Sequence, residues 1–337
     1  MRLMENAIVV ENVTKRFGTV QALKGISFEV PEATVFGLLG PNGAGKTTAI
    51  RILSTILAPD SGTATVLGFD VAKSPDDVRL RIGLAGQFAA VDPNLTGREN
   101  LWMTGRLAQL TGKDASARAV QLLERFNLIE AADRPIRTYS GGMRRRLDVA
   151  ASLVARPPVV YLDEPTTGLD LHSRNGLWDT IRELVAEGTT VLLTTQYLEE
   201  ADQLAARLAV IDGGMVIAND TPTALKHALG NTVIEMGIGT DDRAARAQSV
   251  LAGVLPAAPD REGSVVRISS DEGARILIDA LRRLENEGLT PATLTVREPS
   301  LDDVFLVLTG HRAEEAPAPG ANGNGKRGRR GRRGGQP

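Results

Sequence analysis

The chain has 337 residues, 42% hydrophobic and 24% charged, with a formal net charge of −2, which predicts a folded protein with room for two domains. The lack of cysteine excludes disulfides and thiolate metal sites, and the three histidines (His172, His227 and His311) are too scattered to suggest a histidine metal cluster. Because no apolar run is long enough for a membrane-spanning helix and the start lacks the pattern of a secretory leader, we expect a cytoplasmic protein.

Short β-branched runs alternate with longer helical patterns over residues 7–225. This alternation predicts an α/β domain with a largely parallel sheet that is covered on both faces. The expected strands are residues 7–13, 27–30, 34–40, 81–86, 159–163, 190–195 and 208–219. The expected helices are residues 46–57, 115–126, 141–155 and 172–187. No long-period repeat is visible, so we expect one copy of this domain.

A second, smaller α+β domain is predicted by the three strand–helix alternations that follow. Its expected strands are residues 231–239, 264–270 and 293–300, and its expected helices are 242–252, 272–286 and the apolar run 300–310. We predict domain boundaries at 1–229, 230–311 and 312–337. The second domain contains no recognisable catalytic constellation, and we interpret it as a regulatory or dimer-stabilising module.

The last segment, residues 312–337, has almost nothing to bury and is expected to be disordered. Six basic residues are gathered in its run KRGRRGRR (326–333), which leaves the rest of the chain more acidic than the total charge suggests. That distribution is not the one expected of a specific nucleic-acid binder. We interpret the tail as a solvated extension, with contact to anionic lipid or RNA as the alternative.

A phosphate-binding loop is predicted at GPNGAGKTT (40–48), which fits G-x-x-x-x-G-K-[ST] and stands between an apolar strand and a helix. Its glycines let backbone N–H groups face a phosphate chain, and the helix adds its positive end. Lys46 is expected to reach the β- and γ-phosphates of ATP, and the Thr47 hydroxyl to ligate Mg²⁺. The expected nucleotide contacts are Gly40, Pro41, Asn42, Gly43, Ala44, Gly45, Lys46, Thr47 and Thr48.

Two acids end the apolar strand VVYLDEP (159–165). In a phosphate-loop enzyme the aspartate at such a strand end holds Mg²⁺, which is the role expected of Asp163. Glu164 is then placed to accept a hydrogen bond from the water that attacks the γ-phosphate, as a base or an orienting group. An acidic strand end that leads into a turn at Pro165 is the alternative interpretation.

A second predicted anion site lies in YSGGMRRRL (139–147), where two glycines follow a serine and open a helix. With this motif the sequence resembles the ATP-binding cassette (ABC) ATPases over residues 7–225. The resemblance implies a P-loop NTPase cassette with an antiparallel β subdomain and a helical subdomain. It also implies that Ser140, Gly141 and Gly142 hold the γ-phosphate of a second copy in a head-to-tail dimer. Tyr139 and Met143 depart from the usual leucine and glutamine, which questions the ribose contacts.

The same resemblance assigns three further residues. Phe17 matches the aromatic residue that stacks on adenine, and Gln87 matches the glutamine that approaches Mg²⁺ and faces the membrane partner. Asp170, in TTGLD, matches the aspartate at the dimer contact.

Gln196, in VLLTTQYLEEAD, stands where most ABC ATPases carry a histidine near the γ-phosphate. A glutamine amide can donate to phosphate and accept from water, but it does not titrate near neutral pH. A site that does not hydrolyse ATP is the alternative. The presence of Lys46, Asp163 and Glu164 argues against it, and we predict that Gln196 is a neutral γ-phosphate sensor.

Within the superfamily, the motifs TYSGGMRRRLD, DEPTTGLD, LLTTQYLEEADQLA and PSLDDVFLVLTG resemble the daunorubicin-resistance (DrrA-type) ATPases of actinobacterial drug exporters. This resemblance implies a peripheral ATPase on the cytoplasmic side of the cell membrane, with a separate permease that exports drugs or other hydrophobic compounds. An exporter of a complex lipid or an ion is one alternative. A cassette protein that acts on ribosomes or nucleic acid is another, although the chain has neither a second cassette nor a long coiled-coil insertion.

Overall fold

Three sheets organise the residues that the computed structural model describes, which are 6–87, 90–230, 232–252 and 259–309. The central sheet has the strand order β10-β9-β3-β8-β7-β6, and all neighbouring pairs are parallel except β9 with β10. Its strands are β3 (Val35–Leu39), β6 (Ile82–Ala85), β7 (Val159–Asp163), β8 (Thr190–Thr195), β9 (Arg207–Asp212) and β10 (Met215–Asp220).

The inner strands β3, β7 and β8 are buried at every residue because both faces of the sheet are covered. In β7, Val159 and Tyr161 belong to one hydrophobic cluster, whereas Val160 and Leu162 belong to another. Alternate side chains of one strand therefore pack on opposite sides, as expected for a parallel sheet between layers.

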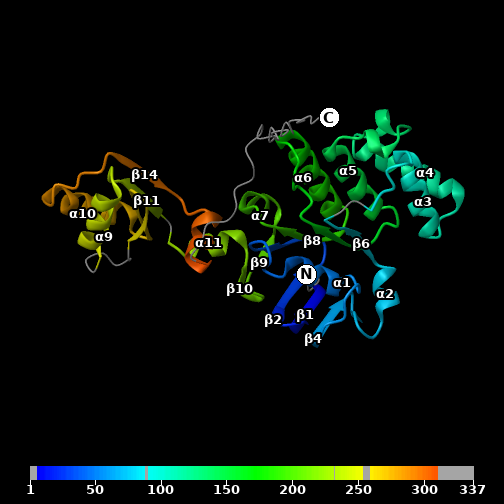
Figure 1. Ribbon diagram of the computed structural model, residues 1–337, viewed down its shortest axis with the longest axis horizontal. Helices are drawn as coiled ribbons and strands as arrows, with labels where there is room; N and C mark the ends of the chain where they lie inside the picture. The colour runs from blue at the N-terminus through cyan, green and yellow to red at the C-terminus, as the bar shows by residue number, and fades with distance from the viewer. Residues whose placement is uncertain (1–5, 88–89, 231, 253–258, 310–337) are drawn as a thin grey trace, which may run out of the picture.

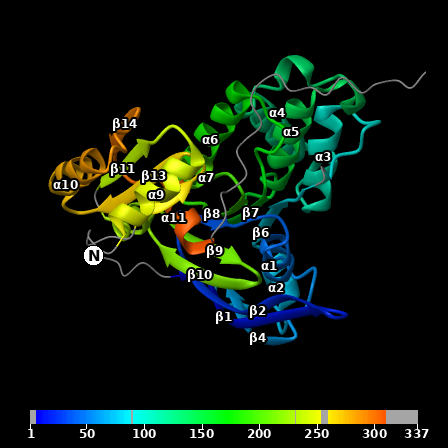
Figure 2. The same ribbon diagram turned by 60° about the vertical axis from the view of Figure 1, so that its left-hand side comes forward.

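One layer contains an antiparallel sheet of order β2-β1-β4-β5 together with helix α1, and both contribute to one cluster. The elements are β1 (Asn6–Phe17), β2 (Val20–Pro31), β4 (Ser61–Val66), β5 (Phe69–Asp70), α1 (Lys46–Leu53) and α2 (Pro75–Arg79). The opposite layer is helical and consists of α3 (Gly97–Leu107), α4 (Gly112–Arg125), α5 (Gly141–Ser152) and α6 (Leu171–Ala186). Both views place β1, β2 and β4 on the far side of the central sheet from α3 and α4 (Figures 1 and 2).

The parallel register brings three functional strand ends together. Leu39, which ends β3, lies opposite Thr195 of β8, and Asp163, which ends β7, lies opposite Thr194. The loop that begins at Gly40, the acids 163–164 and Gln196 therefore all leave the sheet at its carboxyl edge, where α/β proteins bind ligands.

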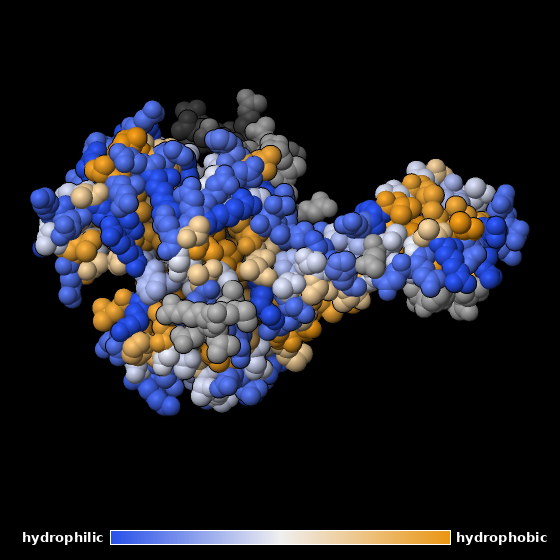
Figure 3. Space-filling view, turned by 180° about the vertical axis from the view of Figure 1, so that it is seen from behind, coloured by the Kyte–Doolittle hydropathy of each residue, from blue (hydrophilic) through white to orange (hydrophobic). Residues whose placement is uncertain are grey.

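A small lobe follows, with the chain order β11, α9, β12, β13, α10, β14 and the sheet order β12-β13-β11-β14. Its elements are β11 (Thr232–Gly237), α9 (Asp241–Leu251), β12 (Asp260–Glu262), β13 (Val265–Ser270), α10 (Gly273–Asn286) and β14 (Thr293–Arg297). This is a split β-α-β arrangement of the ferredoxin type. Its own cluster of apolar side chains runs from Ile234 to Leu289. A narrow neck joins the lobe to the larger body (Figure 3).

The last described helix, α11 (Leu301–Thr309), lies against the large domain. Its residues Leu301, Val304 and Phe305 share a cluster with Leu198 and Leu208. The helix packs beside α7 (Leu198–Leu204) and α8 (Pro222–His227), and Figure 1 shows it between the lobe and α7. The domain boundaries remain a prediction, but part of the segment 230–311 contributes to the core of the preceding domain.

Each expected element overlaps an observed one, but two expectations are corrected. The run 208–219, expected as one strand, forms the hairpin of β9 and β10, and the helix expected over 46–57 ends at Leu53. Gly213 and Gly214 both have positive φ (51° and 84°), as a two-residue hairpin turn of type I′ requires. Among the described residues, no helix has the length and apolar character needed to cross a bilayer. The predicted basic tail, 312–337, lies outside the described residues.

Candidate active site

The loop 40–45 needs glycine at two positions. A Cβ on Gly40 would lie 2.2 Å from the carbonyl oxygen of Ile211, and a Cβ on Gly45 would lie 2.7 Å from Cδ2 of Leu23. Gly45 also has a φ of 113°, which side chains disfavour. It is the residue before α1, so the amide end of that helix faces the loop. This arrangement suits phosphate.

Lys46 is buried and folds back over the loop. Its Nζ donates hydrogen bonds to the carbonyl oxygens of Gly40 (2.7 Å) and Pro41 (3.1 Å), and it lies 3.5 Å from Oε1 of Glu164. The ammonium group is thus held between the phosphate loop and the second acid of the β7 end.

Asp163 joins the strand end to α1. Its Oδ1 accepts hydrogen bonds from the hydroxyls of Thr47 (3.2 Å) and Thr194 (2.5 Å), and the residue is buried. The two oxygen groups predicted to hold Mg²⁺ therefore lie within hydrogen-bonding distance. Carboxylate and hydroxyl oxygens are suitable ligands for this hard cation, so the residues fit the ion.

Glu164 has a left-handed backbone, with a φ of 49°. Its N–H donates to the carbonyl oxygen (3.1 Å) and to the hydroxyl (3.0 Å) of Thr194. A non-glycine residue in this region costs free energy and is retained when its surroundings hold it in place. Thr194 therefore holds both acids, and sequence reasoning missed it as a site residue. The signal was present in the pair of threonines that ends an otherwise apolar strand.

A recess of about 140 Å³ brings several predicted residues together. Besides the loop it is lined by Gln87, which follows β6, and by Glu164, which follows β7. The lining residues are Ala22, Asn42, Gly43, Ala44, Gly45, Lys46, Thr47, Thr48, Gln87 and Glu164.

Gln196 follows β8 beside the start of the loop, because the N–H of Gly40 donates to the carbonyl oxygen of the preceding Thr195 (3.3 Å). The Oε1 atom of Gln196 is buried and has no hydrogen-bond partner within the described part of the chain. An acceptor without a partner at this edge of the sheet is suited to a water molecule or another donor from a ligand.

Ser140, Gly141 and Gly142, called the signature residues from here on, lie at the start of α5 and do not line this recess. Ser140 caps the helix, accepting a hydrogen bond from the N–H of Met143 (3.2 Å). A Cβ on Gly142 would lie 3.2 Å from Oγ of Ser173 on α6, the helix that Asp170 caps. The signature and Asp170 are thus neighbours, and neither lines the recess. The N–H of Ser173 donates to Asp170 (2.7 Å) and lowers the pKa of its carboxyl.

The side chain of Tyr139, the residue before Ser140, is directed into the helical layer. Its hydroxyl donates to the carbonyl oxygen of Ala131 (2.7 Å), and the side chain is buried in the helical layer. Burial raises the pKa of this phenol. The departure from leucine at this position therefore changes the core of the helical layer.

Phe17, at the end of β1, is 46% exposed, and Nζ of Lys15 lies 5.9 Å from its ring centroid. An exposed aromatic face can stack on a base. Phe17 is not among the residues that line the recess.

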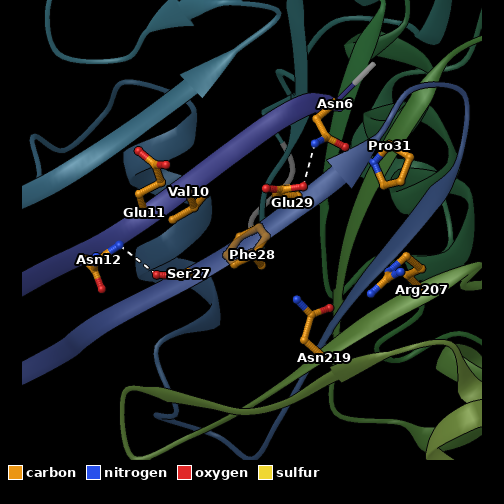
Figure 4. Close-up of a pocket in the computed structure, with 10 residues that line it drawn as sticks. All are labelled: Asn6, Val10, Glu11, Asn12, Ser27, Phe28, Glu29, Pro31, Arg207 and Asn219. Carbon is orange, nitrogen blue, oxygen red and sulfur yellow. Dashed lines mark hydrogen bonds between the residues drawn. The ribbon is translucent and has the colours of Figure 1, made fainter. Parts of the chain in front are cut away.

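A larger polar recess, of about 690 Å³, lies between β1 and β2 on one side and Arg207 and Asn219 on the other (Figure 4). Some of its polar groups already pair: the side chain of Asn6 donates to Glu29 (2.6 Å), and the backbone N–H of Asn12 donates to the hydroxyl of Ser27 (2.9 Å). None of the predicted nucleotide residues lines it, so its size does not make it the candidate site.

Comparison with known proteins identifies the family. The ABC transporter family model matches residues 23–167. The chain is 53% identical over 314 residues to the daunorubicin resistance ATP-binding protein DrrA2 of Streptomyces coeruleorubidus, covering 93% of this chain and 98% of that protein. The chain belongs to the ATP-binding proteins of ABC transporters. This ABC protein is also 44% identical over 318 residues to the doxorubicin resistance ATP-binding protein DrrA of Mycobacterium tuberculosis, with coverage of 92% and 95%.

Solved structures agree with the fold of this ABC protein. A nucleotide-free ATP-binding cassette aligns with a TM-score of 0.60 at 25% identity, covering 67% of this chain and 95% of that one. A dimeric cassette in a post-hydrolysis state, bound to ADP and phosphate, aligns with a TM-score of 0.59 at 24% identity, covering 64% and 98%.

The predicted fold class, the resemblance to the daunorubicin-resistance ATPases and the ATPase activity are confirmed. The protein binds nucleotide and hydrolyses ATP, and action on ribosomes or nucleic acid is not favoured. The roles of single residues remain predictions.

Proposed function

We propose that this ATPase energises a separate membrane permease that exports drugs or other hydrophobic compounds from the cytoplasmic side of the membrane. The relatives named above carry drug resistance in their names, and a further relative, 37% identical over 302 residues, is a linearmycin resistance ATP-binding protein of Bacillus subtilis. A peripheral protein of this kind needs a partner for the membrane passage itself.

We also propose that the protein acts as a head-to-tail dimer. The observation that supports this is the separation of the two anion sites within one chain. The recess contains the phosphate loop, Gln87 and Glu164, whereas the signature and Asp170 lie on the starts of α5 and α6. A second copy in head-to-tail orientation would place its Ser140, Gly141 and Gly142 on the γ-phosphate. The site of each copy is then complete only in the closed dimer, which couples ATP binding to a movement that the permease can use.

Each of the predicted site residues has a distinct role when ATP is bound. Phe17 stacks on adenine, the loop amides hold the phosphates, and Lys46 moves its ammonium from the loop carbonyls to the β- and γ-phosphates. Thr47, Asp163 and Gln87 would hold Mg²⁺, which neutralises phosphate charge when bound. Glu164 orients the attacking water, while Gln196 donates to phosphate and accepts from that water through its Oε1.

The permease mainly determines which compound is transported, because the site described here would contact the nucleotide and not the transported compound. A relative 39% identical over 307 residues is a Nod factor export ATP-binding protein of Ralstonia nicotianae. Export of a complex lipid or an ion is nevertheless not favoured, because the relatives at 53% and 44% identity are named for drug resistance.

Transport in inside-out vesicles tests the proposal. Vesicles that contain this chain and its permease subunit should accumulate daunorubicin with ATP, and vesicles with the permease alone or with the Glu164→Gln chain should not. Accumulation that is equal in all three preparations, or absent while the ATPase is active, would contradict drug export by this pair.

A further inference from the structure

Arg145 on α5 is a buried arginine that holds three backbone segments at once. Its Nη2 donates to the carbonyl oxygen of Asp163 (2.6 Å), its Nε donates to that of Pro165 (2.9 Å), and its Nη1 donates to that of Gly86. Two of these carbonyls flank Glu164, and the third directly precedes Gln87. One guanidinium therefore connects the backbone around the attacking-water residue to the segment that carries the permease-facing glutamine.

Asp148, one helical turn further along α5, completes the connection. Its Oδ2 lies 3.4 Å from Nη1 of Arg145, and its Oδ1 accepts a hydrogen bond from the N–H of Ala90 (2.7 Å). Burial lowers the pKa of Arg145 and raises that of Asp148, which is the cost of placing two charges in the interior. Such a pair is tolerated where its hydrogen-bonding groups are satisfied, and each nitrogen of Arg145 has an acceptor.

The neighbouring arginines of the same run do not share this environment. Arg144 donates to the carbonyl oxygen of Arg137 (3.1 Å), and Arg146 donates to that of Phe126 (3.0 Å), so both bind within the helical layer. The position of Arg145 on the inner face of α5 gives it access to the strand ends.

We propose that Arg145, oriented by Asp148, is a positioning residue that fixes the Glu164 backbone to the Gln87 segment, so that catalysis in the recess depends on the position of that segment. This inference rests on the proposed roles of Glu164 and Gln87. The left-handed φ of Glu164 would relax if the carbonyls on either side lost their anchor. Because the carbonyl acceptors of Arg145 lie outside the loop 40–48, the turnover rate should fall more than the affinity for ATP.

Steady-state phosphate release and equilibrium ATP binding by the purified full chain test this role. Arg145→Met should lower kcat by about tenfold to hundredfold while changing KM for ATP by less than about threefold, because a small displacement of an orienting group costs rate. Arg145→Lys should fall between, because one ammonium cannot reach three carbonyls. Arg118→Met is the matched control, since Arg118 also donates to a backbone carbonyl (Leu153, 2.7 Å) but lies on α4.

A double-mutant cycle with Gln87 distinguishes a positioning role of Arg145 from a general effect on protein stability. The rate losses of Arg145→Met and Gln87→Ala should be clearly less than multiplicative in the double variant, because both changes disturb the same connection. If Arg145→Met does not fold, Arg145→Lys carries the same cycle. Unchanged kcat, equal loss of ATP binding and turnover, or independent losses in the cycle would each overturn the proposal. None of these readouts depends on drug transport, so a failed export assay leaves them interpretable.

Discussion

Thr194 shows how one hydroxyl can organise a carboxylate pair. It donates to Asp163 and accepts from the N–H of Glu164, so it fixes the orientation of one acid and the backbone of the other. Groups that orient metal-binding carboxylates commonly affect activity by one to two orders of magnitude. We therefore expect Thr194 to affect activity, although it lies inside a buried strand.

Thr194→Val should lower kcat by about tenfold or more and raise the Mg²⁺ concentration that gives half-maximal activity, because Asp163 loses an oriented donor. Phosphate release measured across a Mg²⁺ titration provides both values. Thr180→Val is the control, because that buried hydroxyl bonds to Gly176 within α6. Equal Mg²⁺ dependence in wild type and Thr194→Val would contradict the role given to this hydroxyl.

Gln196 should act as a hydrogen-bonding group without proton transfer. Gln196→His should preserve activity, whereas Gln196→Ala should lose hydrolysis more than ATP binding because an acceptor and a donor disappear. The histidine variant should also gain a pH dependence between about pH 6 and 8 that the wild type lacks. Phosphate release over that range, with ATP affinity measured in parallel, decides the point. An alanine variant with wild-type turnover would show that the side chain is dispensable.

The residues of the phosphate loop and the β7 end could be predicted from sequence because their chemistry depends on neighbours in the chain. Gly45, Lys46 and Thr47 follow one another at a strand–helix junction. Arg145 could not be predicted in this way, because its three acceptors come from segments that folding brings together. Three consecutive arginines look alike in the sequence, and the packing of α5 selects one of them.

Helix α11 is the element whose placement adds most to the sequence-based account. The apolar run 300–310 predicted a helix, but the sequence does not indicate that its residues 301, 304 and 305 pack on the large domain. The structure also connects it to the lobe through polar groups: Arg297, at the end of β14, binds both oxygens of Asp303 (2.7 and 2.9 Å). Asp303 therefore lies where the lobe, α11 and the large domain meet.

Acid should weaken this junction. Burial would raise the pKa of Asp303, but hydrogen bonds from Arg297 and Ser300 outweigh it and lower that pKa to about 2. A depressed folded-state pKa contributes stability above the ordinary value of 3.8 and loses it as the pH falls toward 2. Asp303→Asn should therefore reduce the free energy of unfolding by about 2 kcal/mol at pH 7.

Urea unfolding at several pH values checks this prediction. The gap, which is the difference in the free energy of unfolding between wild type and Asp303→Asn, should stay constant from pH 7 to about pH 5. It should narrow as the pH falls to 3, since protonation removes the charge of Asp303 that the variant also lacks. A gap that is constant down to pH 3, or that widens, would contradict the assigned cause.

At the scale of the whole molecule, the chain leaves the large domain, forms the lobe and returns to it. The neck in Figure 3 and the position of α11 in Figures 1 and 2 show this path. Truncation after Leu229 consequently removes two things at once, the lobe and a helix that covers Leu198 and Leu208. A cleaner deletion replaces residues 231–299 by a short flexible linker, which is feasible because α8 and α11 are in contact.

The two deletions should differ in stability. Truncation after Leu229 removes Leu301, Val304 and Phe305 from their cluster and should lower the free energy of unfolding by on the order of 5 kcal/mol. The linker variant keeps these residues and should therefore keep most of the wild-type free energy of unfolding. Denaturant unfolding of both variants measures the difference. The linker variant then tests the lobe itself: unchanged dimerisation, ATPase activity and transport would argue against a regulatory or dimer-stabilising role.

ATP hydrolysis by Glu164→Gln tests the proposed mechanism most directly. The amide keeps the shape of the side chain but accepts the proton of the attacking water poorly, so phosphate release should fall by about a hundredfold or more. ATP affinity should stay within about threefold, because the loop 40–48 and Lys46 hold the phosphates. Glu130→Gln, an exposed glutamate in the helical layer, is the control. Phosphate release near the wild-type rate, or a loss of ATP binding as large as the loss of turnover, would contradict the role of Glu164.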